Sequence, residues 1–320
     1  MLHSPAIAVL GPQRHRPTVN EALAALDLEL SARIATVTAG WEEREDEDAE
    51  LHEHLWSRSV NLKLYARSDA ALREDPELRM GVRWRTERLR EAQELYRIRV
   101  AHALEAAREL FRREPRANAA DLLAAERAGA IETLRALDAE HERLTDTVRE
   151  EFIARWRPLE RPAVVRQRAE VEGLLADVPV VCVAGGHVAV LLNVLRLFDF
   201  PRLIGARALV VWSAGAMALS ERVVLFHDSP PQGQGSAEVL ETGLGIVRGI
   251  LPLPHASQRL RLAEPQRVAM FALRFRPLVC IPLDGDSPDG ARVVWDGRGW
   301  RGLAGTQKLT EEGVLVEVGQ

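Results

Sequence analysis

Short apolar runs alternate with helical spacing at the start of the chain. The run AIAVLG at 6–11 ends at a glycine, PTVNEALAALDLEL at 17–30 has the three- and four-residue spacing of a helix, and ARIATVTAG at 32–40 is a second β-rich run. An acidic segment at 41–56 leads to a possible third strand, VNLKLYA at 60–66. Strand, helix and strand in this order predict the start of a parallel, doubly wound sheet.

From about residue 78 to 156 the chain has the pattern of two long amphipathic helices. RREPRAN at 112–118 separates them, since a proline is disfavoured inside a helix and Asn118 can cap the next one. The pattern predicts an antiparallel helical hairpin whose narrow seam is covered by the partner helix or by another subunit. Its two apolar stripes are Leu89, Ala92, Tyr96, Val100, Ala103, Ala107 and Leu110, then Ala130, Leu134, Leu137, His141, Leu144, Val148 and Phe152.

Alternating structure returns after RPLERPAVV at 157–165. VPVVCVAGGH at 178–187 and ARALVVWSAGAM at 206–217 each predict a buried strand, and a helix is expected at 265–275. Further β-rich runs lie at 222–227, 244–253, 277–285 and 291–297. We therefore expect one discontinuous α/β domain, residues 1–77 and 157–320, with a mostly parallel sheet and with the long helical hairpin 78–156 inserted between its early strands.

The amino-acid composition and the net charge exclude some classes of function. The chain has 320 residues, 47% hydrophobic and 28% charged, which is normal for a globular protein, and its net charge of -5 argues against nucleic acid as a partner. No apolar run approaches the roughly 18 to 20 residues that span a bilayer, so a cytoplasmic location without membrane contact is expected. Cys182 and Cys280 lie in apolar runs and are interpreted as core residues. No motif indicates a cofactor or a metal site, because His52 and His54 would face different sides of a helix.

Ser213 closes the apolar run LVVW and is followed at once by Ala214, Gly215 and Ala216. A catalytic serine needs its Oγ at the carboxyl end of a sheet, with small residues that allow a tight turn. Val211 stands where the G-x-S-x-G motif has its first glycine. A nucleophile and a buried structural serine therefore remain alternatives at this point.

The glycine pair Gly185 and Gly186 follows another buried strand. Glycines there let backbone N–H groups approach a ligand, as in an oxyanion hole, although a plain tight turn explains them too. The histidines downstream of Ser213 are His227 and His255, and His255 follows a strand-like run, where a catalytic imidazole is well placed. Asp228 is the nearest carboxylate after a strand-like run and could orient that imidazole.

Three segments taken together resemble the peptidase E and cyanophycinase family of serine peptidases: AGGHVAVLLNVLR, VVWSAGAMAL and GLGIVRGILPLPHASQRLRL. The resemblance covers most of the chain outside the hairpin and implies the class I glutamine amidotransferase-like fold. It implies that Ser213 is the nucleophile, that His255 is the base and that Asp228 is the acid. It also implies that Gly186 and the N–H of Ala214 form the oxyanion hole, and that the substrate is a peptide or a small amide.

The chain departs from that family after the glycine pair. His187 stands where the family usually has Asn or Asp, and Ala256 follows the histidine in place of a frequent phenylalanine. Gly185, His187 and Arg259 are the expected substrate-binding residues, since an arginine can hold a carboxylate through two hydrogen bonds. The competing hypothesis is a non-catalytic protein that senses a small ligand and uses the hairpin to bind a partner. A homodimer formed through the hairpin is compatible with an active enzyme as well.

Overall fold

The structure of the protein is a computed structural model, which describes residues 6–28, 31–226, 237–284, 290–303 and 305–319. The first five strands of the main sheet are parallel to one another, and helical crossovers connect each of them to the next. Two antiparallel strands extend the sheet at one side. In spatial order the seven strands are β11 (Trp300–Leu303), β10 (Arg292–Trp295), β1 (Ile7–Leu10), β5 (Ala208–Trp212), β4 (Val180–Val183), β2 (Ile34–Val37) and β3 (Ser59–Asn61).

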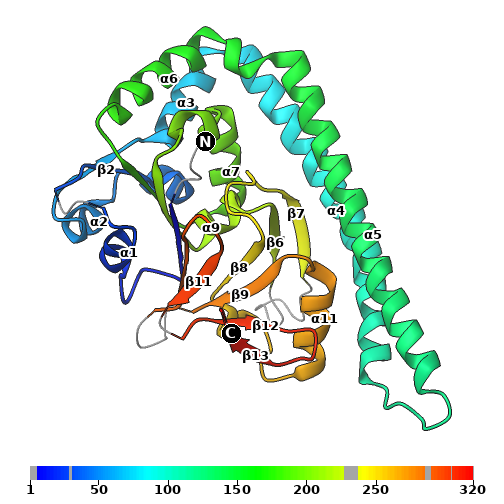
Figure 1. The fold of residues 1–320 in the computed structure, drawn as a ribbon. Coiled ribbons are helices and arrows are strands. Elements are labelled where there is room, and N and C mark those ends of the chain that lie inside the picture. Colours follow the sequence, from blue (N-terminus) through cyan, green and yellow to red (C-terminus); the bar gives the residue numbers. More distant parts are fainter. Residues whose placement is uncertain (1–5, 29–30, 227–236, 285–289, 304, 320) are drawn as a thin grey trace.

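Helices cover both faces of this sheet (Figure 1). Alternate strand residues point to opposite faces: Leu10 and Val210 pack with α1 and α2, while Val9 and Val211 face the larger core that holds α7 and α9. The expected α/β class with a large parallel sheet is confirmed. The helices of the α/β part are α1 (Val19–Ala25), η1 (Ala39–Arg44), α2 (Ala49–His54), α3 (Leu64–Glu74), η2 (Pro158–Glu160), α6 (Pro162–Leu175), α7 (Val188–Leu197), α8 (Phe200–Ile204), α9 (Ala214–Leu219), α10 (Ala256–Arg259) and α11 (Pro265–Phe275).

Three smaller strand pairs complete the fold. They are β6 (Arg222–Leu225) with β7 (Glu238–Thr242), β8 (Ile250–Pro254) with β9 (Val279–Leu283), and β12 (Gln307–Leu309) with β13 (Leu315–Glu317). The β8–β9 pair is parallel and packs beside α9 and α11. The third expected strand is shorter than predicted, because α3 already begins at Leu64.

Two 37-residue helices, α4 (Pro76–Arg112) and α5 (Ala120–Trp156), run antiparallel along one side of the molecule (Figure 1). They pack on each other and on α11 and β7. The apolar seam is therefore covered within the chain, and Tyr96, Val100 and Leu134 belong to the same core as the sheet. The insertion and the α/β part share one hydrophobic core.

Polar side chains occupy part of the inner face of the hairpin. The two apolar stripes predicted from the sequence did not include them. Leu144, expected in the stripe, is 44% exposed, whereas Asp138 and Arg149 are buried. Asp138 accepts hydrogen bonds from Arg274 of α11 at 2.7 and 2.8 Å and from the Tyr96 hydroxyl at 2.6 Å. A charge is tolerated inside a protein only with such partners, so this group ties α4, α5 and α11 together.

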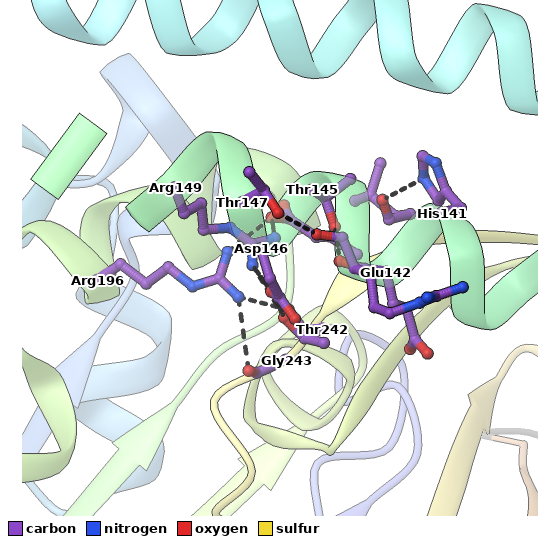
Figure 2. Close-up of polar contacts among 12 residues, drawn as sticks. His141, Glu142, Thr145, Asp146, Thr147, Arg149, Arg196, Thr242 and Gly243 are labelled. Carbon is purple, nitrogen blue, oxygen red and sulfur yellow. Dashed lines mark hydrogen bonds and ion pairs between the residues drawn. The ribbon is translucent and has the colours of Figure 1, made fainter. Parts of the chain in front are cut away.

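A second buried polar group joins α5 to β7 and α7 (Figure 2). Arg149 donates to Asp146 at 2.6 Å and to Thr242 at 2.9 Å, and it pairs with Glu241. Arg196 donates to the same Glu241 carboxylate at 2.6 Å. Two arginines on one buried carboxylate hold the hairpin firmly against the sheet domain.

Two further predictions concern the cysteines and membrane-spanning helices. Cys182 and Cys280 are buried free thiols, as expected for core residues, and burial raises the pKa of Cys182 to about 12. Within the residues that the structure describes, no helix combines the length and the apolar character needed to cross a bilayer.

Candidate active site

Ser213 lies on a sharp turn between β5, which ends at Trp212, and α9, which begins at Ala214. Its backbone has φ 50° and ψ −124°, a region that side-chain-bearing residues rarely adopt. Such a conformation costs about 1–3 kcal/mol and persists only where its surroundings enforce it. The Ala214 N–H is at the first position of α9, where a helix offers no acceptor. The turn therefore presents the serine at the carboxyl end of the sheet, beside a helix N-terminus.

Gly185 lies directly against Ser213. A methyl group on Gly185 would be 2.7 Å from Ser213 Cβ and 3.5 Å from Ser213 Oγ. The start of α9 is equally close to the preceding strand, because a methyl group on Gly215 would be 2.4 Å from the Val183 carbonyl oxygen. Only glycine at both positions lets the serine turn approach the turn after β4 so closely.

The next residue, Gly186, has φ 128° and lies against Gly40 at the start of η1, which follows β2. A methyl group there would be 2.2 Å from the Gly40 carbonyl oxygen, and the same oxygen accepts a hydrogen bond from the His187 N–H at 2.7 Å. The turns after β2, β4 and β5 thus meet at one edge of the sheet, the edge at which open α/β sheets bind ligands. Gly40 is a site neighbour that the sequence marked only as the end of a strand.

His187 is the residue before α7 and caps that helix. Its Nδ1 accepts a hydrogen bond from the Val190 N–H at 3.3 Å. One ring nitrogen is therefore engaged in the local structure, as an Asn or Asp side chain would be at a helix N-cap.

His255 follows β8 and has a left-handed backbone, with φ 58° and ψ 34°. Its N–H donates to the Leu283 carbonyl oxygen at the end of β9, at 3.1 Å. Leu283 in turn lies against Gly11, because a methyl group on Gly11 would be 3.2 Å from the Leu283 carbonyl. Gly11 follows Leu10, the residue that pairs with Trp212 next to Ser213. The half-buried His255 and Ser213 therefore lie at the same edge, connected through the ends of β9, β1 and β5.

Asp284 is a carboxylate near His255 that sequence reasoning overlooked. Its Oδ1 accepts hydrogen bonds at 2.9 Å from both the N–H and the hydroxyl of Ser257, two positions after His255. The feature of the sequence that could have identified Asp284 is its position directly after the apolar run of β9. Asp228, the predicted orienting acid, and His227, the competing base, lie outside the described residues.

Arg259 is the last residue of the short helix α10, and His255 is the residue directly before that helix. Its guanidinium carbon lies 5.9 Å from the centre of the Phe226 ring, and burial lowers the pKa of Arg259 from its ordinary value. The stretch 257–264 lines a hollow of about 460 Å³. This volume is within the range of small-molecule sites, about 300–1,000 Å³. The hollow begins just after His255.

Comparisons with known proteins do not establish the chemistry of this site. No protein-family model matches the chain, and no curated protein matches it. One similar solved structure is that of a peptidase from an acI-B1 Actinobacterium, with 13% sequence identity, a TM-score of 0.48, and coverage of 100% of this chain and 97% of that chain. A likeness this distant supports no inference about function.

Proposed function

We propose that the protein is a serine hydrolase that cleaves a peptide or a related amide bond through an acyl-enzyme on Ser213. His255 is the general base, Asp228 orients its imidazole, and the N–H groups of Gly186 and Ala214 hold the oxyanion. Substrate contacts come from Gly185, His187 and Arg259. No cofactor takes part in this chemistry.

The reaction has two balanced halves. His255 removes the proton from Ser213 Oγ as that oxygen bonds to the substrate carbonyl carbon, and the carbonyl oxygen becomes the oxyanion. The oxyanion collapses, the C–N bond breaks, and the proton passes from His255 to the departing amine. Water then loses a proton to His255 and attacks the ester, and the carboxylic acid leaves as the proton returns to Ser213.

The observation that carries this proposal is the strained backbone at Ser213. A serine that merely closes a buried strand gains nothing from φ 50° and ψ −124°, and a relaxed turn would save about 1–3 kcal/mol. Strain of this size at a sheet edge, with Gly185 in contact, is typical of a turn that presents a nucleophile.

The orienting acid can be assigned by two matched substitutions. In the proposal Asp228→Asn removes the carboxylate that stabilises the charged imidazole, so the rate should fall on the order of 10³- to 10⁴-fold. Asp284→Asn keeps one acceptor for Ser257 and should lower the rate far less. If instead Asp284→Asn nearly abolished the reaction and Asp228→Asn did not, Asp284 would take the orienting role.

A fluorophosphonate probe, which reacts with activated serines, tests the nucleophile itself. Wild-type protein and Ser31→Ala, a change at an exposed serine, should be labelled equally. Ser213→Ala should not be labelled, and His255→Ala should be labelled at least 10²-fold more slowly because its serine lacks the base. Labelling that survives Ser213→Ala would overturn the proposal.

A further inference from the structure

The segment η1, which follows β2, contacts the turn that carries the proposed oxyanion donor Gly186. The Gly40 carbonyl oxygen accepts a hydrogen bond from the His187 N–H at 2.7 Å. A methyl group on Gly40 would be 2.9 Å from the Gly185 carbonyl oxygen and 3.2 Å from Gly186 Cα. Backbone packed this closely cannot shift on one side without a shift on the other. The position of Gly40 therefore sets the position of the Gly186 N–H.

The Gly186 N–H is available as a hydrogen-bond donor. Among the residues that the structure describes, no group accepts from it, whereas the next N–H, that of His187, is bound to Gly40. A donor stabilises an oxyanion only if it points to the place where the charge develops, and the loss of one donor lowers a rate on the order of 10²- to 10³-fold. A displacement of Gly40 should therefore be visible in the reaction rate.

The segment η1 is not a regular helix. Inside it Glu42 has φ 59° and ψ −127°, close to the strained conformation of Ser213. The Trp41 N–H donates to the Thr38 carbonyl oxygen at 2.8 Å, directly before this residue. The Glu45 N–H donates to the Glu42 carbonyl oxygen at 2.9 Å, directly after it. A strained conformation persists only where its surroundings enforce it, so η1 needs contacts from outside its own backbone.

Glu45 is a buried carboxylate, 2% exposed, that ties η1 to α3. Its two oxygens accept from N–H groups in the first turn of α3: Oε1 from Tyr65 at 3.1 Å and Oε2 from Ala66 at 2.9 Å. These N–H groups have no acceptor within the helix, and a negative charge is favourable at this end of the helix dipole. Because α3 packs on α6 and α7, Glu45 attaches η1 to the body of the fold.

The backbone of Glu45 is held as well. Its carbonyl oxygen accepts from the Thr38 hydroxyl and from the Asn61 side-chain amide, both at 3.1 Å. Thr38 directly follows β2 and Asn61 ends β3, the neighbouring strand. Glu45 is thus the point at which η1 is attached to α3, β2 and β3 together.

We propose that Glu45 is a positioning residue for the oxyanion hole: through η1 it holds Gly40 in place and thereby keeps the Gly186 N–H aimed at the reacting carbonyl group. The proposal rests on the proposed function, because Gly186 is an oxyanion donor only if Ser213 is the nucleophile. In the proposal Glu45 does not contact the substrate. Its removal should lower the rate of the chemical step and leave substrate affinity nearly unchanged.

Titration with a fluorophosphonate probe separates a positioning role from a merely structural one. The rate constant and the final labelled fraction of Ser213 are recorded for wild type, Glu45→Gln and Glu45→Ala. Glu45→Ala should be labelled about 10- to 100-fold more slowly and to the same final fraction, because the donor is misplaced in a folded protein. Glu45→Gln keeps the side-chain length and one acceptor oxygen, so it should restore most of the rate.

Glu47→Ala is the matched control, because Glu47 lies two residues further on, is exposed and pairs with Arg44 at the surface. It should be labelled at the wild-type rate. A structural role of Glu45 would lower the final labelled fraction, since unfolded molecules do not react, without changing the rate constant of the folded ones. A wild-type rate constant in Glu45→Ala would therefore overturn the positioning role, whatever the final fraction.

Amide hydrogen exchange, followed by NMR, tests the connection from Glu45 to the turn without any chemistry at Ser213. The His187 N–H, which is bound to Gly40, should exchange on the order of tenfold faster in Glu45→Ala and at the wild-type rate in Glu47→Ala. Labelling of wild-type Ser213 with unchanged exchange at His187 would overturn the positioning role and leave the hydrolase. Faster exchange at His187 in a protein whose Ser213 is never labelled would support the connection and overturn the hydrolase.

Discussion

Gly185→Ala places one methyl group against the proposed nucleophile. The new Cβ would be 2.7 Å from Ser213 Cβ, whereas ordinary contacts begin at 3.4 Å, a shortfall of 0.7 Å. The neighbouring backbone is packed on both sides, so the serine turn itself has to move. A misplacement of about 1 Å lowers an enzymatic rate on the order of 10²-fold, about 2.7 kcal/mol in activation free energy.

The assay is the rate of fluorophosphonate labelling at Ser213, measured with thermal unfolding of the same samples. Gly129→Ala is the matched control, because nothing lies within 4 Å of its new methyl group on the exposed face of α5. The control should label at the wild-type rate and gain up to about 1 kcal/mol in stability, as alanine replaces glycine in a helix. A Gly185→Ala protein that labels at the wild-type rate would refute the reasoning about the turn.

Two further predictions concern the anchoring of the hairpin. Asp138→Asn leaves the Arg274 charge buried without its counter-ion, so the free energy of unfolding should fall by about 3–5 kcal/mol in urea titrations, while Glu140→Gln, in an exposed pair, should change it by less than about 1 kcal/mol. Burial lowers the pKa of His141 below its ordinary 6.5, so the folded protein resists protonation that the unfolded chain accepts. Stability should therefore be full above pH 6.5 and fall as the pH drops below it, and His141→Gln should reduce that fall between about pH 7 and pH 5. Burial also lowers the pKa of His54, which accounts for part of the remaining fall; an unchanged pH slope in His141→Gln would contradict the prediction.

The sequence predicted well those parts of the fold in which the pattern of apolar residues is uninterrupted and fits one kind of element. The strand before Ser213 is a continuous apolar run that ends at Trp212, and α11 begins and ends at the residues where its periodicity does. Periodicity was misleading on α5, where Leu144 is exposed and the charged Asp138 is buried. A buried ion pair cannot be told from a surface charge until its partner, here on α11, is known.

The turns at the candidate site were predictable where small residues mark a close approach of the backbone. The glycine pair and the residues after Ser213 indicated turns, and the structure has such turns at Gly185, Gly186 and Ser213. The place of Asp284 beside the loop that follows His255 was not predicted, because it depends on which loops meet across the fold. Local patterns carry no information about contacts between distant segments such as α4 and α11.

Mass spectrometry of the protein after fluorophosphonate treatment tests the central claim most directly. Digestion should yield one modified peptide that contains Ser213, with one probe per chain, and no adduct in the Ser213→Ala protein. An adduct on any other residue, or an unmodified Ser213 in folded protein at saturating probe, would contradict the account.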